Sequence, residues 1–119
     1  MKNRRFDQRL GFALRGISLA WNTESSFRTQ IVLGGATTLL LIFLRPPLLW
    51  CALVLLCIGG VLSAEMMNTA FESFVDHLHP DLHPMVARAK DCAAGAVLMM
   101  SLTSVGVLIF LLCEKFHFL

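Results

Sequence analysis

The segment LLWCALVLLCIGGVLSAEMMNTAFESFVD, residues 48–76, decides the fold. Its first 17 residues carry no charge, and no helix breaker separates them from the polar part that follows. At 100° per residue, four polar side chains of that second part fall within about 80° of one another on a helix. They form an acidic stripe that consists of Glu65, Asn68, Glu72 and Asp76. Ionised groups within a membrane span cost about 2.5 to 3.5 kcal/mol each, so the acidic stripe predicts a functional site that a cation compensates.

The chain is too apolar for an ordinary soluble domain, because 56% of its 119 residues are hydrophobic. Its main apolar runs are Ile31–Leu44, Leu48–Ala64 and Cys92–Cys113, of 14, 17 and 22 residues. A membrane span needs about 20 residues, so the first two runs must include polar neighbours at one end. The four cysteines lie in or at the edge of apolar runs without metal-ligand or disulfide spacing, which favours small buried hydrophobic residues. The sequence therefore predicts three transmembrane helices.

The basic residues are distributed unevenly around these spans. Eight of the ten Lys and Arg residues lie before the first span or between the second and third, whereas Arg45 and Lys115 lie on the other side. The positive-inside bias predicts a cytoplasmic N-terminus and a cytoplasmic turn before the third span. The acidic stripe and Lys90 then meet at the cytoplasmic boundary, where ATP is available. Nucleic acid is not an expected partner, because the basic residues are few and the chain is otherwise lipid-facing.

One all-α domain, residues 1–119, accounts for the whole pattern. Apolar residues at helical spacing near the start, with basic residues on other faces, predict an amphipathic helix on the membrane surface. Asn22 and Thr23 offer capping oxygens, and two proline pairs interrupt the later helices. The expected segments are 1–22 (surface helix), 24–44 (first span), 48–78 (second span and its cytoplasmic extension) and 84–114 (third span).

The polar groups of these segments suit magnesium and phosphate chemistry. Two carboxylates can hold a hard cation that bridges phosphate oxygens, a lysine can neutralise a transferring group, and a further carboxylate can take a proton from an alcohol. Glu24 is an additional acid, although an acid in the first turn of a helix is favourable by itself. The histidines of residues 77–83 could be read as a metal cluster. Two prolines interrupt the ligand spacing there, so a solvated loop is the better interpretation.

The acidic stripe and the residues after it resemble the small bacterial integral-membrane diacylglycerol kinase and undecaprenol kinase family. The motifs that carry the resemblance are EMMNTAFESFVD at residues 65–76, AKD at 89–91, AAGAV at 93–97 and WNTESSFR at 21–28. The likeness covers nearly the whole chain, and the spacing of the paired motifs is specific. It implies an ATP-dependent lipid kinase in the bacterial inner membrane, and a homotrimer whose site forms where helices of neighbouring subunits meet.

The resemblance also implies roles for individual residues. Glu65 is similar to the general base that deprotonates the lipid hydroxyl. For MgATP, the resemblance implies Glu24 and Glu72 as ligands of Mg²⁺, Asn68 and Lys90 as phosphate contacts, Asp76 and Asp91 as supports of that site, and Arg5 as a nucleotide contact.

The motifs give conflicting indications of which lipid is the acceptor. Gln30 stands where the diacylglycerol branch usually has an acid, and the His83-Pro84 turn is nearer to the undecaprenol branch, whereas WNTESSFR is nearer to the diacylglycerol branch. We favour undecaprenol slightly, with diacylglycerol as the alternative. Two other functions stay open. One is a small proton-coupled transporter in which a membrane glutamate carries the proton, and the other is a non-catalytic membrane assembly subunit whose polar stripe only pairs helices.

Overall fold

The computed structural model describes residues 3–81 and 83–117, and within these ranges the chain forms four α-helices and no strand. The helices are α1 (Phe6–Thr23), α2 (Ser25–Leu44), α3 (Leu48–Leu78) and α4 (Pro84–Lys115). Of these described helices, α2, α3 and α4 are long and apolar enough to cross a membrane. The predicted fold class, an all-α membrane protein with three spans, is therefore confirmed.

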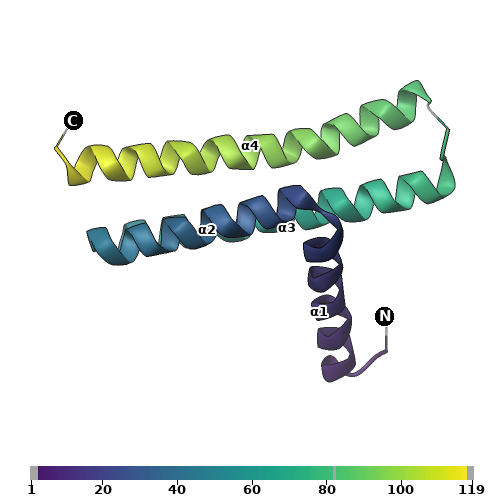
Figure 1. Ribbon diagram of the computed structural model, residues 1–119, viewed down its shortest axis with the longest axis horizontal. Coiled ribbons are helices and arrows are strands. Elements are labelled where there is room, and N and C mark those ends of the chain that lie inside the picture. The colour runs from purple at the N-terminus through teal and green to yellow at the C-terminus, as the bar shows by residue number, and fades with distance from the viewer. Residues whose placement is uncertain (1–2, 82, 118–119) are drawn as a thin grey trace.

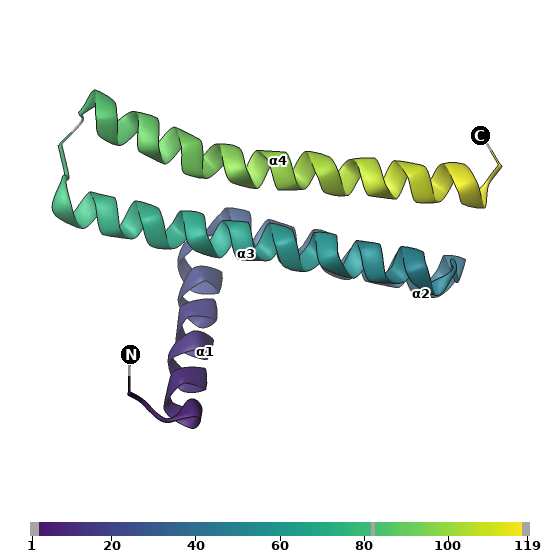
Figure 2. The same cartoon turned by 180° about the vertical axis from the view of Figure 1, so that it is seen from behind.

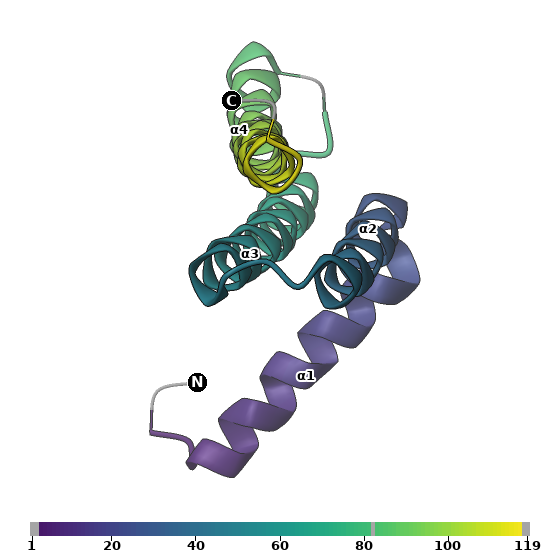
Figure 3. The same cartoon turned by 90° about the vertical axis from the view of Figure 1, so that its left-hand side faces the viewer.

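Helix α3 is the centre of the arrangement. α3 and α4 run antiparallel and side by side along most of their length (Figures 1 and 2), and α2 packs against another side of α3 (Figure 3). Small residues permit the close approach: a Cβ atom added at Gly60 would come within 2.7 Å of Met100 Cε on α4. Glycine is common where membrane helices meet, because backbones can then approach closely.

Helix α1 leaves the three spans at a steep angle (Figures 1 and 2). It contacts α3 through Gly16, which lies beside Met66, while the large apolar residues Phe6, Leu10 and Leu14 stay exposed. Exposed apolar side chains on a helix with basic residues suit a position in the membrane interface. Glu24 separates α1 from α2 in an extended conformation, and Arg28 Nη1 donates a 2.6 Å hydrogen bond across this elbow to the carbonyl oxygen of Trp21.

The opposite end of the spans is closed by a tight turn. Arg45 adopts a left-handed conformation with φ of 50° and caps α2, and the buried Pro46 follows it. Pro47 then precedes the first residue of α3, where its missing N–H leaves no helical bond unmade. Nearby, the Trp50 indole N–H donates to the Glu114 carboxylate and joins the start of α3 to the end of α4.

The core lies along one face of α3. The buried residues Val54, Cys57, Val61 and Glu65 recur at spacings of three and four, which places them on one side of the helix. This face is apolar for two turns and ends at a carboxyl group. Glu65 is 5% exposed and, among the residues that the structure describes, is the one charged side chain that is buried.

Candidate active site

The acidic stripe begins where the buried face of α3 ends. Asn68 lies one turn beyond Glu65, and its Nδ2 donates a long 3.5 Å hydrogen bond to Glu72 Oε1. The Asn68 Oδ1 atom is buried and has no hydrogen-bond partner within residues 3–81 and 83–117. A buried oxygen without a donor costs about 1 to 3 kcal/mol. An oxygen left in this state is suited to a cation or to a donor on a bound molecule.

One ion pair connects the stripe to α4. Lys90 Nζ lies 2.8 Å from Asp76 Oδ1, so the polar C-terminal part of α3 holds the lysine that the sequence singles out. The Lys90 side chain is 34% exposed and that of Asp76 is 61% exposed. At this exposure the pair contributes little to stability, because water screens the two charges. Its evident effect is to fix where the ammonium group points.

Glu24 reaches the same region from the elbow between α1 and α2. The Glu65 carboxyl group interacts electrostatically with both Glu24 and Glu72. Acidic groups from the elbow and from α3 are therefore close enough to influence one another, as a shared site requires. In the described part of the chain, no three His, Cys, Asp or Glu side chains converge into a complete metal site.

A partial set of ligands is still adequate for magnesium. Mg²⁺ usually binds proteins through one or two carboxylates and completes its shell with waters and substrate phosphates. Glu72 on α3 and Glu24 at the elbow each offer one carboxylate, and the Glu65 carboxyl group interacts with both of them. The unpartnered Asn68 Oδ1 lies one turn from Glu72. The residues therefore fit the ion that the resemblance implies.

A polar pocket of about 330 Å³ lies beside the stripe, at the turn between α3 and α4. Glu72, Asp76, Lys90 and Asp91 line it on the helix side. His79, Asp81 and His83 of the turn line it as well, although the sequence pattern indicates a solvated loop for them. They are exposed, and His83 also caps α4 by accepting a 3.1 Å hydrogen bond from the Met85 N–H.

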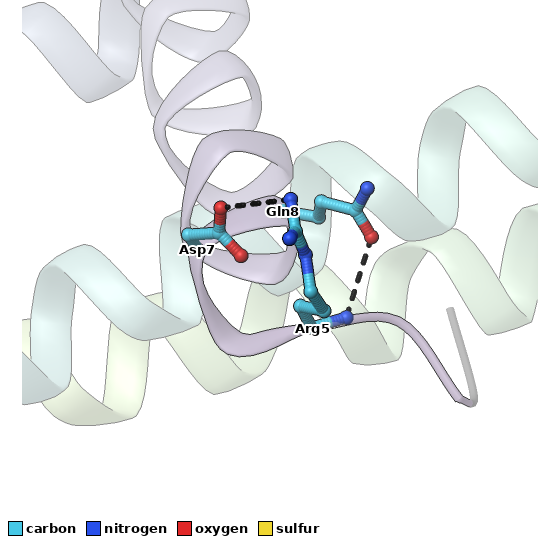
Figure 4. Close-up of polar contacts among 3 residues, drawn as sticks. All are labelled: Arg5, Asp7 and Gln8. Carbon is cyan, nitrogen blue, oxygen red and sulfur yellow. Dashed lines mark hydrogen bonds and ion pairs between the residues drawn. The ribbon is translucent and has the colours of Figure 1, made fainter.

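Of the predicted site residues, Arg5 is the one that the fold places away from the acidic stripe. It stands just before α1, at the end of that helix that points away from the spans (Figures 1 and 2). Its Nη2 lies 3.4 Å from Asp7 Oδ2, and its backbone N–H donates a 3.3 Å bond to Gln8 Oε1 (Figure 4). Arg5 and Asp7 are both exposed, so this pairing is weak and does not prevent other contacts.

Gln30 and Ser101 are two further polar residues near Glu65. The Gln30 Nε2 on α2 donates a 3.5 Å hydrogen bond to Ser101 Oγ on α4, and the Gln30 side chain lies close enough to the Glu65 carboxyl group to interact with it. Sequence patterns give no role to Ser101, because a serine in an apolar helix is common. Its contact with Gln30 joins α4 to α2, and it becomes apparent only when the helices are packed together.

The three spans and the buried carboxyl group of Glu65 define the class: a multi-pass membrane protein with a polar cluster at one end of an apolar helix face. A family model described as prokaryotic diacylglycerol kinase matches residues 11–112, and the chain belongs to this family. It is a lipid kinase.

Several curated proteins are similar over most of their length. The undecaprenol kinase of Bacillus subtilis is 35% identical over 109 residues, which is 90% of this chain and 89% of that protein. The diacylglycerol kinase of Helicobacter pylori is 32% identical over 97 residues, 81% of this chain and 75% of its own. The diacylglycerol kinase of Escherichia coli K12 is 27% identical over 106 residues, 89% of this chain and 87% of its own.

Proposed function

We propose that this lipid kinase transfers the γ-phosphate of MgATP to the hydroxyl group of a membrane lipid alcohol at the cytoplasmic face of the bacterial inner membrane. The observation that carries the proposal is the position of Glu65. It lies at the end of an apolar helix face, about two helical turns before Glu72, which lines a polar pocket together with Lys90. A lipid alcohol and a nucleotide could approach this carboxyl group from opposite sides.

Glu65 is the proposed general base. A carboxylate that is 5% exposed has little water to compete with a substrate hydroxyl for its lone pairs. Within hydrogen-bond reach, it takes the proton of the alcohol as the alcohol oxygen attacks the γ-phosphorus. The bond from that phosphorus to the bridging oxygen of ADP breaks, and ADP leaves with the electron pair.

The phosphates belong in the pocket at the cytoplasmic turn. Lys90, held by Asp76, neutralises charge that develops on the transferring group, and the Asn68 side chain contacts the phosphates from α3. Glu72 and Glu24 are the proposed ligands of Mg²⁺, which supplies charge neutralisation across the β- and γ-phosphates when bound. Asp91 lines the pocket and supports it, and Arg5 is retained as a nucleotide contact from the surface helix.

An apolar groove suits the acceptor lipid. A cavity of about 290 Å³ lies between α2 and α4 on the surface of α3, and Leu33, Val54, Val61 and Leu108 are among its lining residues. The Cα atoms of α2 and α4 come no closer than 8 Å to one another in the described ranges, so the groove is open toward the lipid. Val61 is one turn from Glu65. An alkyl chain in this groove would direct its hydroxyl end to the proposed base.

Undecaprenol is the slightly favoured acceptor and diacylglycerol the alternative. The Bacillus subtilis undecaprenol kinase and a Synechocystis diacylglycerol kinase are both 35% identical, but the match covers 89% of the first protein and 55% of the second. Gln30 in place of an acid also favours undecaprenol.

A homotrimer with sites between subunits remains part of the proposal, because Glu24 stands at an elbow that a neighbouring chain could cover.

A phosphotransfer assay tests the reaction and the acceptor together. The full chain in nanodiscs receives ATP labelled at the γ-phosphate, with undecaprenol and diacylglycerol offered in parallel and without added lipid alcohol. We expect labelled lipid with at least one acceptor, and a loss of label when EDTA removes magnesium. ATP turnover that does not depend on a lipid alcohol would contradict the proposal, and proton flux without ATP would favour the transporter.

A further inference from the structure

Gln30 links the three spans at one level. Its half-buried side chain on α2 donates from Nε2 to Ser101 Oγ on α4 at 3.5 Å, and it lies close enough to the Glu65 carboxyl group on α3 to interact with it. An amide NH₂ group carries two hydrogens, so one side chain can serve both acceptors. Gln30 also lines the apolar groove between α2 and α4, next to Val61.

The register of the two antiparallel helices independently places Ser101 opposite Glu65. Asp76 pairs directly with Lys90. Ser101 follows Lys90 by eleven residues along α4, and Glu65 precedes Asp76 by the same eleven residues along α3. Eleven residues are about three full turns, so each helix returns to the same face over this distance. Glu65 and Ser101 therefore lie side by side on the α3–α4 pair, about three turns from Asp76 and Lys90. Gln30 on α2 lies beside Glu65 and Ser101.

We propose that Gln30 is a positioning residue that holds the Glu65 carboxyl group in the orientation needed to meet the acceptor hydroxyl. The inference rests on the proposed function of Glu65 and adds to it a residue that touches neither phosphate nor nucleotide. Because Glu65 is almost fully enclosed, water cannot easily replace the amide donor. A carboxyl group without the neighbouring amide is free to rotate away from the groove, and small errors of orientation lower the rate strongly.

The hydrogen bond between Gln30 and Ser101 is weak. At 3.5 Å the bond from Gln30 is at the long limit for an N–H donor. Ser101 therefore steadies the amide without determining where it lies. Loss of the Ser101 hydroxyl group should have a smaller effect than loss of the amide itself.

Steady-state kinetics of the full chain in nanodiscs test the inference. Gln30→Met keeps the length of the side chain and removes both donors, and Thr38→Val is the matched control on the same helix, where the hydroxyl group bonds to the Gly34 carbonyl. We expect Gln30→Met to lower kcat by about tenfold or more while KM for MgATP stays within about twofold, because binding of the nucleotide does not involve Gln30. Ser101→Ala should lower kcat by about two- to threefold, and Thr38→Val should match the wild type.

A double substitution shows whether Gln30 acts through Glu65. In the Glu65→Gln background, adding Gln30→Met should cause no further loss of the residual rate, because residues that act as a unit are not additive. A full tenfold loss in that background, or a Gln30→Met enzyme as active as Thr38→Val, would overturn the inference. These outcomes differ from failure of the proposed function, in which the wild-type chain itself phosphorylates neither lipid alcohol.

Discussion

The two ends of the α3–α4 pair are each joined by one polar link, and they differ in what surrounds it. At the end beside the α2–α3 turn, the Trp50 indole meets the Glu114 carboxylate. At the end beside the α3–α4 turn, Asp76 meets Lys90 next to a polar pocket, with an unpartnered Asn68 oxygen among the described residues and further acids nearby. The Trp50–Glu114 link pairs a donor with an acceptor. Around the Asp76–Lys90 link, by contrast, polar groups remain available to a ligand.

This difference separates structural from functional polarity within one helix pair. Polar groups in a membrane protein are costly wherever they lie, so their presence does not by itself identify a site. Polar groups that find no partner within the fold are better indicators of a functional site. Their burial costs free energy and brings no gain in stability. Four substitutions test the comparison.

The largest effect is expected at the buried carboxyl group. Glu65→Gln keeps the size of the side chain and removes its basicity, so turnover should fall by about 10³-fold or more. Helical content and the thermal stability in detergent should stay close to those of the wild type. Phosphotransfer to undecaprenol and diacylglycerol measures the loss. Near-normal turnover of the folded variant would remove Glu65 from the role of base.

Replacement of the lysine should be the next most damaging change. Lys90→Met keeps much of the aliphatic stem and removes the charge that would stabilise the transferring phosphoryl group. We expect kcat/KM for MgATP to fall by about 10²-fold. Arg88→Met on the same turn is the matched control, because Arg88 is exposed and its guanidinium contacts Met85 instead of the acidic stripe. Equal losses in both variants would point to a general effect of positive charge at the start of α4.

The partner of that lysine should have a smaller effect. Asp76→Asn leaves Lys90 in place and weakens the contact that directs it, so we expect a loss of about tenfold in kcat/KM. Stability should change by less than about 1 kcal/mol, because the pair is exposed to water. A loss as large as that of Lys90→Met would indicate that Asp76 contacts the substrate directly.

The sequence was sufficient for the fold because the signals were strong. Uncharged runs of 17 and 22 residues, together with the proline pairs, leave few arrangements other than three spans, and α2, α3 and α4 match that prediction. The helical period alone places Glu65, Asn68, Glu72 and Asp76 on one face. These signals are local, so they need no knowledge of how the helices pack.

The remaining features depend on contacts between distant segments. The 2.8 Å pair of Asp76 and Lys90 joins residues on either side of a turn, and the contact between Gln30 and Ser101 joins the first span to the third. Helical periodicity within a segment carries no information about such pairs. The roles of Glu24, Glu72 and Arg5 in binding MgATP stay predictions, and the phosphotransfer assays address them.

The smallest effect is expected at the end beside the α2–α3 turn. Trp50→Phe removes the indole N–H and leaves an aromatic ring, so the Glu114 carboxylate loses its donor from α3. Hydrogen bonds between membrane helices average about 0.6 kcal/mol, so unfolding in detergent should show a loss of this order. Turnover should stay within about twofold of the wild type, since Trp50 is 15 residues from Glu65, a distance of about 22 Å along the helix. If Trp50→Phe instead lowers turnover as much as Asp76→Asn does, the two ends are coupled through α3 and α4. The contact between Trp50 and Glu114 would then help to set the geometry of the site.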